Sequence, residues 1–182
     1  MRIHIFGASG SGVTTLGLRL AQQLQYPYFD NDDFFWEKSD PPFTVRRAPH
    51  LRNQLLKDNL SLTDGNYIVG GSMVSWGDEW LLAFDLAVFL YVPPQVRLDR
   101  LKKREYERYG DVIYKNPERH QQYLDFIAWA ASYDDPASTR RSLGVHLNWM
   151  SKLKCELIRI DGVTSVEYRT KLVLAAVDNY PR

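Results

Sequence analysis

A short apolar run, a glycine-rich turn and a helical pattern follow one another without interruption near the start of the chain. Ile3 to Phe6 is apolar, GASGSG occupies positions 7–12, and helical spacing runs from Thr14 to Leu24. A strand that enters a helix through such a turn is the first half of a β-α-β unit, whose strands lie parallel in one sheet. This segment alone therefore predicts an α/β fold.

The alternation of strands and helices continues along the chain. Four further short apolar runs lie at 26–29, 67–69, 86–92 and 157–160, and helical patterns lie at 49–60, 78–84, 94–109 and 165–179. Such alternation is typical of a parallel sheet with helices on both faces.

A polar, turn-rich stretch at about 110–143 interrupts this order and is expected to be an insertion between the fourth and fifth strands. Its middle, ERHQQYLDFIAWAASY, places Tyr123, Phe126, Ile127 and Ala130 on one face of a helix. Two interpretations stay open: the helix completes the core, or it belongs to a mobile lid.

Size and charge limit the possible functions. The 182 residues suit one compact domain spanning 1–182. With 23 basic and 22 acidic residues, no overall charge excess points to nucleic acid or an anionic membrane, so neither is an expected partner. Cys155 is the only cysteine, and the first residues lack a long apolar run, so a cytoplasmic protein is expected, either monomer or homodimer.

The turn at 7–12 nearly fits the spacing of a phosphate-binding loop, which is glycine, four residues, glycine, lysine, then serine or threonine. Gly7, Gly12 and Thr14 are in register, but Val13 stands at the lysine position. Backbone N–H groups at the positive end of a helix bind phosphate without a side-chain charge. The alternative is a plain turn rich in small residues. The residues expected to hold the phosphates are Gly7, Ala8, Ser9, Gly10, Ser11, Gly12, Val13, Thr14 and Thr15.

The valine at position 13 removes the positive charge that normally lies beside the transferred phosphate. Another cation must replace it if transfer is to be fast. The candidates are Arg100, Lys103 and Arg104 in one helical pattern, and Arg140 and Arg141 in the insertion.

With this loop, the sequence resembles the small-molecule kinases of the P-loop class, the group that includes adenylate kinase and shikimate kinase. The resemblance implies a three-layer fold with a five-stranded parallel sheet in the order 2-3-1-4-5. It also implies ATP and Mg²⁺ as cofactors, an acceptor-binding region at about 30–60 and a lid at about 110–143. Thr14 is then the expected Mg²⁺ ligand.

YFDNDDFFW, at the end of the second predicted strand, resembles the Asp-x-Asp pattern of shikimate kinases, with Asp30 and Asp32 as the matching pair. The resemblance implies that Asp30 organises Mg²⁺ through water and that Asp32 engages the acceptor hydroxyl, whose proton a carboxylate can accept. Asp33 is a substitute for either role. The alternative is a solvated acidic turn.

Two further segments are expected to bind the acceptor. Gly70, Gly71 and Ser72 stand where shikimate kinases have a glycine run, and the absence of an aspartate at position 70 favours a non-nucleotide acceptor. A tight strand exit is the alternative for these residues. Where these kinases hold an anionic part of the acceptor, the sequence carries three arginines, Arg46, Arg47 and Arg52.

FLYVPPQVRLDRLKKRE and SYDDPASTRR resemble adenylate kinase segments. The first implies that Arg100 packs on the nucleotide base and that Arg104, one helical turn away, reaches its phosphates. The second is a looser match to a lid that carries a catalytic arginine, represented here by Arg140 or Arg141. A solvated charged face is the alternative for the first segment.

Three functions follow from these features. The first is an ATP- and Mg²⁺-dependent kinase that transfers the γ-phosphate to a hydroxyl or phosphate of a metabolite. The second is a regulatory protein that binds a nucleotide with little or no transfer, as the missing lysine would allow. The third and most remote is a sulfotransferase, against which the short chain and the missing lysine both count.

Overall fold

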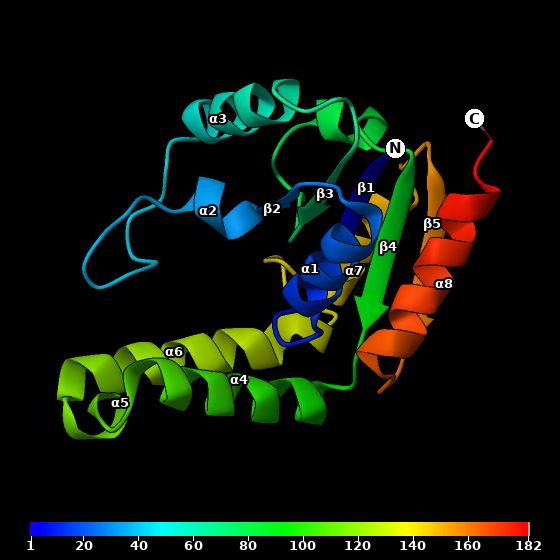
Figure 1. Ribbon diagram of the computed structural model, residues 1–182. Coiled ribbons are helices and arrows are strands. Elements are labelled where there is room, and N and C mark those ends of the chain that lie inside the picture. The colour runs from blue at the N-terminus through cyan, green and yellow to red at the C-terminus, as the bar shows by residue number, and fades with distance from the viewer. Residues whose placement is uncertain (182) are drawn as a thin grey trace.

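The computed structural model describes residues 1–181, and its centre is one parallel sheet. The strand order is β2-β3-β1-β4-β5, which confirms the order 2-3-1-4-5 and the expected fold class (Figure 1). β1 is central and pairs with β3 on one side and with β4 on the other. The strands are β1 (Arg2–Gly7), β2 (Tyr28–Asp30), β3 (Tyr67–Gly70), β4 (Leu86–Tyr91) and β5 (Glu156–Asp161).

Helices connect the strands, and several of them begin where the sequence supplies an N-terminal signal. Proline occupies the first turn of α3, α4 and α6, and the side chain of Asn116, Ser142 or Ser165 caps α6, α7 or α8. The helices are α1 (Val13–Leu24), α2 (Asn31–Phe35), α3 (Pro49–Ser61), α4 (Pro94–Tyr109), α5 (Val112–Lys115), α6 (Pro117–Ala131), α7 (Leu143–Met150) and α8 (Val166–Asn179), with two short 3-10 helices, η1 (Asp78–Leu82) and η2 (Ser132–Asp134).

The helices differ from the sequence-based expectation in four places. α2, α5 and α7 were not expected, and the segment expected to be a helix at 78–84 is the 3-10 helix η1. α2 and α5 have five and four residues, which is too short for a periodic signal.

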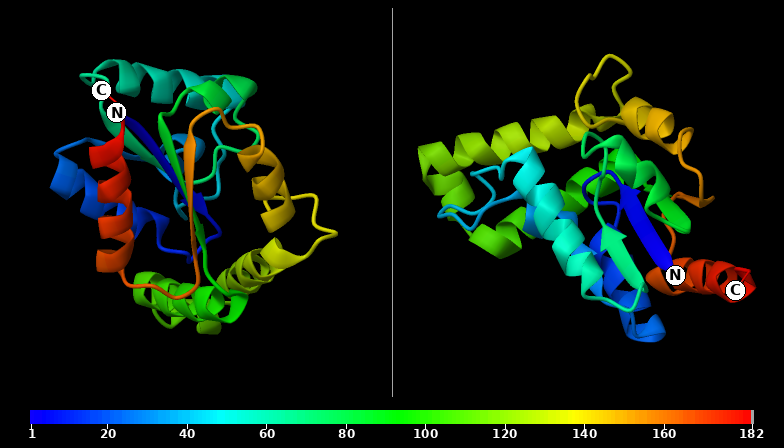
Figure 2. Two further views of the ribbon diagram at one scale, coloured as in Figure 1. Left: turned by 90° about the vertical axis from the view of Figure 1, so that its right-hand side faces the viewer. Right: turned by 90° about the horizontal axis from the view of Figure 1, so that it is seen from above.

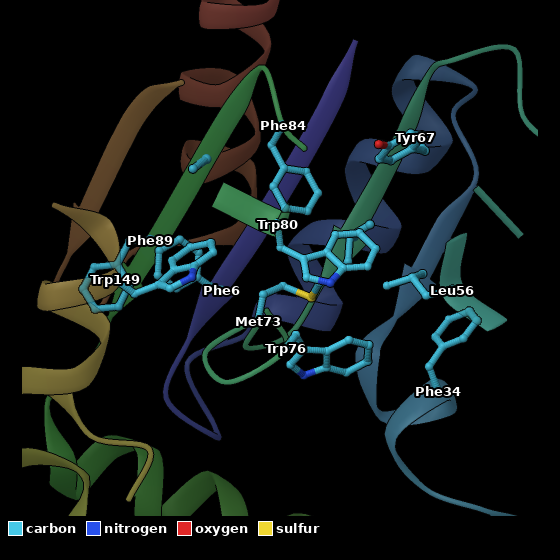
Figure 3. Packing of buried hydrophobic residues seen from close by; sticks show 12 residues of the cluster. Phe6, Phe34, Leu56, Tyr67, Met73, Trp76, Trp80, Phe84, Phe89 and Trp149 are labelled. Atoms are coloured by element: carbon cyan, nitrogen blue, oxygen red, sulfur yellow. The ribbon is translucent and has the colours of Figure 1, made fainter. Parts of the chain in front are cut away.

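The two faces of the sheet bury different kinds of side chain. Residues with one parity along the strands, such as Ile5 and Val88, join the aliphatic side chains of α1 and α8. Residues with the other parity, such as Phe6 and Phe89, join an aromatic cluster with side chains of α3, α7 and η1 (Figure 3). Figure 2 shows helices on both sides of the sheet. Because helices cover both faces of the sheet, a ligand can reach the sheet only at its edges and at the ends of its strands.

The segment expected as an insertion is mostly helical. α4, α5 and α6 form an arm that extends from the end of β4, and α6 packs back along α4 (Figure 1). Among the described residues, neither of the two core clusters contains a side chain of α6. The helix therefore packs on its neighbours in the arm instead of completing the sheet core, and the lid role stays a prediction.

Across residues 1–181, no helix combines the length and the apolar character that crossing a membrane requires.

Candidate active site

The carboxyl ends of the strands open onto a cavity of about 500 Å³. This edge, beside the central strand where connections leave in opposite directions, is where open α/β sheets bind ligands, and the volume suits a small molecule. The lining residues come from segments far apart in sequence: Gly7, Ala8, Ser9, Gly10, Gly12, Val13, Thr14, Thr15, Asp30, Asp32, Gly71, Ser72, Arg100, Leu101, Arg104, Arg108, Arg141, Thr164, Val166 and Arg169.

The glycine-rich loop is shaped by close backbone contacts. Gly10 and Gly12 have φ angles of 81° and 95°, which side chains disfavour. A Cβ atom at Gly10 would lie 2.8 Å from the carbonyl oxygen of Arg97 in α4, and one at Gly7 would lie 2.4 Å from that of Leu90 in β4. The loop therefore sits tightly between β4 and α4, with the N-terminus of α1 at the cavity, as an anion-binding loop requires.

Thr14 and Asp30 meet at one side of this loop. The Thr14 hydroxyl donates a hydrogen bond of 3.0 Å to Asp30 Oδ2, and the Tyr28 hydroxyl donates one of 3.1 Å to the same oxygen. Burial and the charge of Asp30 raise the pKa of Tyr28, so Tyr28 stays protonated and remains a donor. A hydroxyl and a carboxylate fit the oxygen ligands that Mg²⁺ takes alongside phosphate oxygens. Residues 1–181 contain no cluster of three or more His, Cys, Asp or Glu residues that could hold a metal.

Asp32 lies on the cavity wall at the first turn of α2. Its backbone N–H donates to Asp30 Oδ1 over 3.1 Å, and this cap sets the direction of the short helix. Asp32 is exposed on the cavity wall, yet the protein atoms that surround its carboxylate raise its pKa, and the charge of Asp30 raises it further, whereas Arg141 and Arg104 act in the opposite direction. Its carboxylate is thus a stronger proton acceptor than an ordinary aspartate.

Three arginines of α4 line the cavity at intervals of four residues, which places Arg100, Arg104 and Arg108 on one helical face. Arg100 Nη1 donates to the carbonyl oxygen of Gly10 over 3.2 Å. The Arg108 guanidinium lies over the ring of Phe43, 5.0 Å from its centroid. The sequence analysis missed Arg108, although its spacing from Arg104 is the signal that could have found it.

Arg141 reaches the phosphate loop from the segment after η2. Its Nη2 donates to Ser9 Oγ over 2.8 Å, and its guanidinium lies over the Trp129 ring at 4.7 Å. Its buried Nε has no hydrogen-bond partner among residues 1–181. Arg140, by contrast, is exposed and does not line the cavity. Of the two arginines considered for the lid role, only Arg141 lies in the cavity.

Arg169, near the start of α8, is a cavity residue that the sequence analysis missed. Its Nη1 donates to the Ser11 carbonyl over 2.7 Å, and its Nε donates to Thr164 Oγ1 over 2.7 Å. Arg169 is 4% exposed, so it braces the loop from the far end of the chain. No sequence motif near Arg169 predicts this role, because Arg169 and Ser11 are 158 positions apart in the sequence.

The other residues expected to bind the acceptor divide into two groups. Gly71 and Ser72 line the cavity, whereas Gly70, Asp33, Arg46, Arg47 and Arg52 do not. Arg52 donates to the Ser75 carbonyl over 2.7 Å and stacks on Trp76, and Arg47 donates to the Phe34 carbonyl over 2.5 Å. These last two arginines fix the loops on the acceptor side, and their binding role stays a prediction.

Asp134, which was expected in the lid, forms an ion pair with Arg97. Arg97 is fully buried, and its Nε donates to the Val92 carbonyl over 2.9 Å. Because the Arg97 backbone also contacts Gly10, the base of the insertion is tied through α4 to the phosphate loop.

Known proteins resemble this chain in sequence and in fold. The profile of the AAA domain family matches residues 3–121. The uncharacterized protein YqaC of Bacillus subtilis is 37% identical over 172 residues, 94% of each chain. The shikimate kinase of Microcystis aeruginosa is 30% identical over 116 residues, which cover 57% of this chain and 58% of that enzyme. The crystal structure of shikimate kinase from Bacteroides thetaiotaomicron matches 98% of both chains with a TM-score of 0.59 at 20% identity, which shows a shared fold.

Proposed function

This chain belongs to the AAA domain family, and we propose that it is an ATP- and Mg²⁺-dependent kinase that phosphorylates a small metabolite. One observation carries the proposal: a phosphate-type loop and a carboxylate with a raised pKa, Asp32, lie on the same arginine-lined cavity. Its similarity to shikimate kinases supports the same class of reaction.

The charge of the cavity favours a polyphosphate. Within the described chain, its walls carry five arginines, which outnumber the two aspartates, Asp30 and Asp32. Guanidinium groups bind phosphates through paired N–H donors, and the loop adds backbone donors at a helix N-terminus. A triphosphate compensates this positive charge better than a neutral ligand.

Thr14 and Asp30 are the residues that would hold the metal ion, since their oxygens lie 3.0 Å apart beside the loop. When bound there, Mg²⁺ supplies positive charge to the phosphates.

Asp32 is the proposed proton acceptor. The acceptor hydroxyl oxygen forms a bond to the γ-phosphorus, the bond between that phosphorus and the ADP oxygen breaks, and the hydroxyl proton passes to the Asp32 carboxylate. If the acceptor is itself a phosphate, its oxygen is already ionised and no proton has to be accepted. The raised pKa of Asp32 favours the first case.

Arg141 is the proposed replacement for the missing lysine. Its guanidinium reaches Ser9 of the loop, whereas Val13 carries no charge. A guanidinium beside the transferred group stabilises the charge that develops there.

The acceptor pocket is proposed to lie around Gly71, Ser72 and Asp32, which line the cavity, and Arg100 is proposed to contact the nucleotide base. The pocket walls are small and polar, which suits a compact hydroxylated metabolite better than a second nucleotide.

Val13 favours one second candidate, a protein that binds the nucleotide with little or no transfer. Calorimetric titration with ATP and with ADP, each with Mg²⁺, tests the binding that both candidates share. Product analysis with a panel of hydroxy acids, sugar acids, polyols and nucleosides then separates them. Binding without any phosphorylated product would favour the second candidate, and absence of binding would overturn both. Tighter binding of 3′-phosphoadenylyl sulfate than of ATP would instead indicate sulfate transfer.

A further inference from the structure

A buried hydrogen-bond chain runs from the cavity wall to the base of the insertion. Ser72 Oγ lies 2.8 Å from His146 Nε2, and His146 Nδ1 lies 2.6 Å from the Tyr133 hydroxyl. Ser72 lines the cavity, while His146 is fully buried in α7 and Tyr133 is 3% exposed in η2. Three segments distant in sequence therefore share one polar connection.

The direction of the hydrogen bonds follows from the number of protons available. The Tyr133 hydroxyl is buried, so its proton needs an acceptor, and among the described residues His146 Nδ1 is the one hydrogen-bond partner of that hydroxyl. Tyr133 therefore donates to Nδ1. A neutral imidazole carries one N–H, which must then be on Nε2 and must donate to Ser72 Oγ. The hydroxyl proton of Ser72 is left free to point into the cavity.

His146 is held in the neutral state that this reasoning needs. Burial, together with the nearby charges of Arg141 and His4, lowers its pKa to about 3. Its ring packs edge-on against Phe6, with the centroids 5.3 Å apart. Such a histidine is a poor base at neutral pH, so the Ser-His pair lacks what activation of a serine nucleophile requires.

The backbone that carries Ser72 is fixed on both sides. His4 Nε2 donates to the Gly71 carbonyl over 2.8 Å, and the Asn31 side chain donates to the Ser72 carbonyl over 3.2 Å. The main chain at Ser72 is therefore fixed and its hydroxyl oxygen is held by His146. Only the hydroxyl proton of Ser72 can still change direction.

We infer that Tyr133 and His146 are positioning residues that hold the Ser72 hydroxyl as a hydrogen-bond donor to an oxygen of the acceptor. The acceptor part of this inference rests on the proposed kinase function. The site is then expected to prefer acceptors that carry this oxygen, because an analogue without it would leave the Ser72 hydroxyl proton without a partner. Since Tyr133 belongs to η2, beside the Arg97–Asp134 ion pair, the donor is also tied to the position of the insertion.

The orientation can be tested in the ligand-free protein. Long-range ¹H–¹⁵N spectra of the ¹⁵N-histidine-labelled chain distinguish the two neutral tautomers, and His146→Phe assigns the signal. We expect the Nε2–H tautomer at neutral pH in the unmodified protein and its partial loss in Tyr133→Phe. Tyr67→Phe is the matched control, because it removes another buried tyrosine hydroxyl, which donates to the Ala83 carbonyl over 3.3 Å. An Nδ1–H tautomer in the unmodified protein would overturn the inference.

Kinetics test the effect on the acceptor. With an acceptor from the panel above, Tyr133→Phe is expected to raise the KM for the acceptor about five- to tenfold and to leave the KM for ATP unchanged. Tyr67→Phe should change neither constant. Equal changes in both KM values, or no change, would contradict the positioning role. If no acceptor is phosphorylated, the proposed function fails, while the tautomer signal still decides the orientation of the chain.

Discussion

Arg141 and Ser9, 132 positions apart in the sequence, are joined by a hydrogen bond of 2.8 Å between a guanidinium nitrogen and the Ser9 hydroxyl oxygen. This contact brings a positive charge to a loop that has Val13 where related loops have lysine. Arg141→Ala is therefore expected to lower kcat by about 10³-fold. Arg140→Ala is the matched control, because Arg140 is exposed outside the cavity, and its kcat should stay near that of the unmodified protein. Steady-state rates of ADP release measure both, and equal rates for the two variants would contradict the assignment.

Asp32→Asn should lower kcat by roughly 10²- to 10⁴-fold, because the amide cannot accept the hydroxyl proton. ATP affinity, measured by calorimetry, should be unchanged. Asp33→Asn is the adjacent control and should keep most of the activity, since Asp33 does not line the cavity. If Asp32→Asn kept full turnover, Asp32 could not be the proton acceptor.

Val13→Lys should leave ATP affinity equal or make it tighter, because it restores an ammonium group at a position that already lines the cavity. In the double variant with Arg141→Ala, the lysine should recover part of the lost rate. Calorimetry and rates of ADP release measure these effects. Loss of ATP binding in Val13→Lys would show that the loop does not have the geometry of a phosphate loop.

Gly10→Ala should destabilise the chain and abolish nucleotide binding, since the new Cβ would lie 2.8 Å from the Arg97 carbonyl oxygen at a φ of 81°. Gly65→Ala is a matched control, because Gly65 has a φ of 87° but open space around it. The control should lose only about 1–2 kcal/mol from the positive φ. Thermal unfolding with and without Mg²⁺-ATP measures both variants, and similar losses would mean that the contact with α4 is unimportant.

The free energy of unfolding should fall as the pH decreases below about 6.5. The pKa of His4 is lowered to about 4, mainly by burial, and that of His146 is lowered to about 3 by burial and the charges near it. Between these values and pH 6.5, the unfolded chain therefore binds more protons than the folded chain. Stability from these groups is complete above pH 6.5 and is lost toward pH 4, at up to about 1.4 kcal/mol per pH unit for each histidine. Urea unfolding across this range measures the slope. His4→Phe should reduce the slope, because it removes one of the two histidines with a lowered pKa.

The sequence predicted the sheet well because each strand is a short apolar run between turn residues. Its order came from the resemblance to P-loop kinases, and the structure confirms it. α7 could not be predicted in the same way. Its sequence, LGVHLNWM, is short and almost continuously apolar, so it gives no helical periodicity.

The sequence predicted those site residues that belong to a local motif at a strand end or in a loop. Thr14, Asp32 and Arg141 were all proposed from local motifs, and the structure brings them to one cavity. His146 and Arg169 gave no such signal, because a single histidine in an apolar segment and a single arginine in an amphipathic helix have no characteristic spacing. Their contacts, with Ser72 and with the loop, join residues 74 and 158 positions apart.

The division of the core into an aromatic and an aliphatic face has an optical consequence. Trp76, Trp80 and Trp149 belong to the aromatic cluster, whereas the aliphatic cluster under α1 and α8 contains no tryptophan among the described residues. Trp129, moreover, lies directly under the Arg141 guanidinium. Tryptophan fluorescence should therefore change when a ligand enters the cavity or the aromatic cluster loosens. It should change little when the aliphatic layer under α1 and α8 loosens.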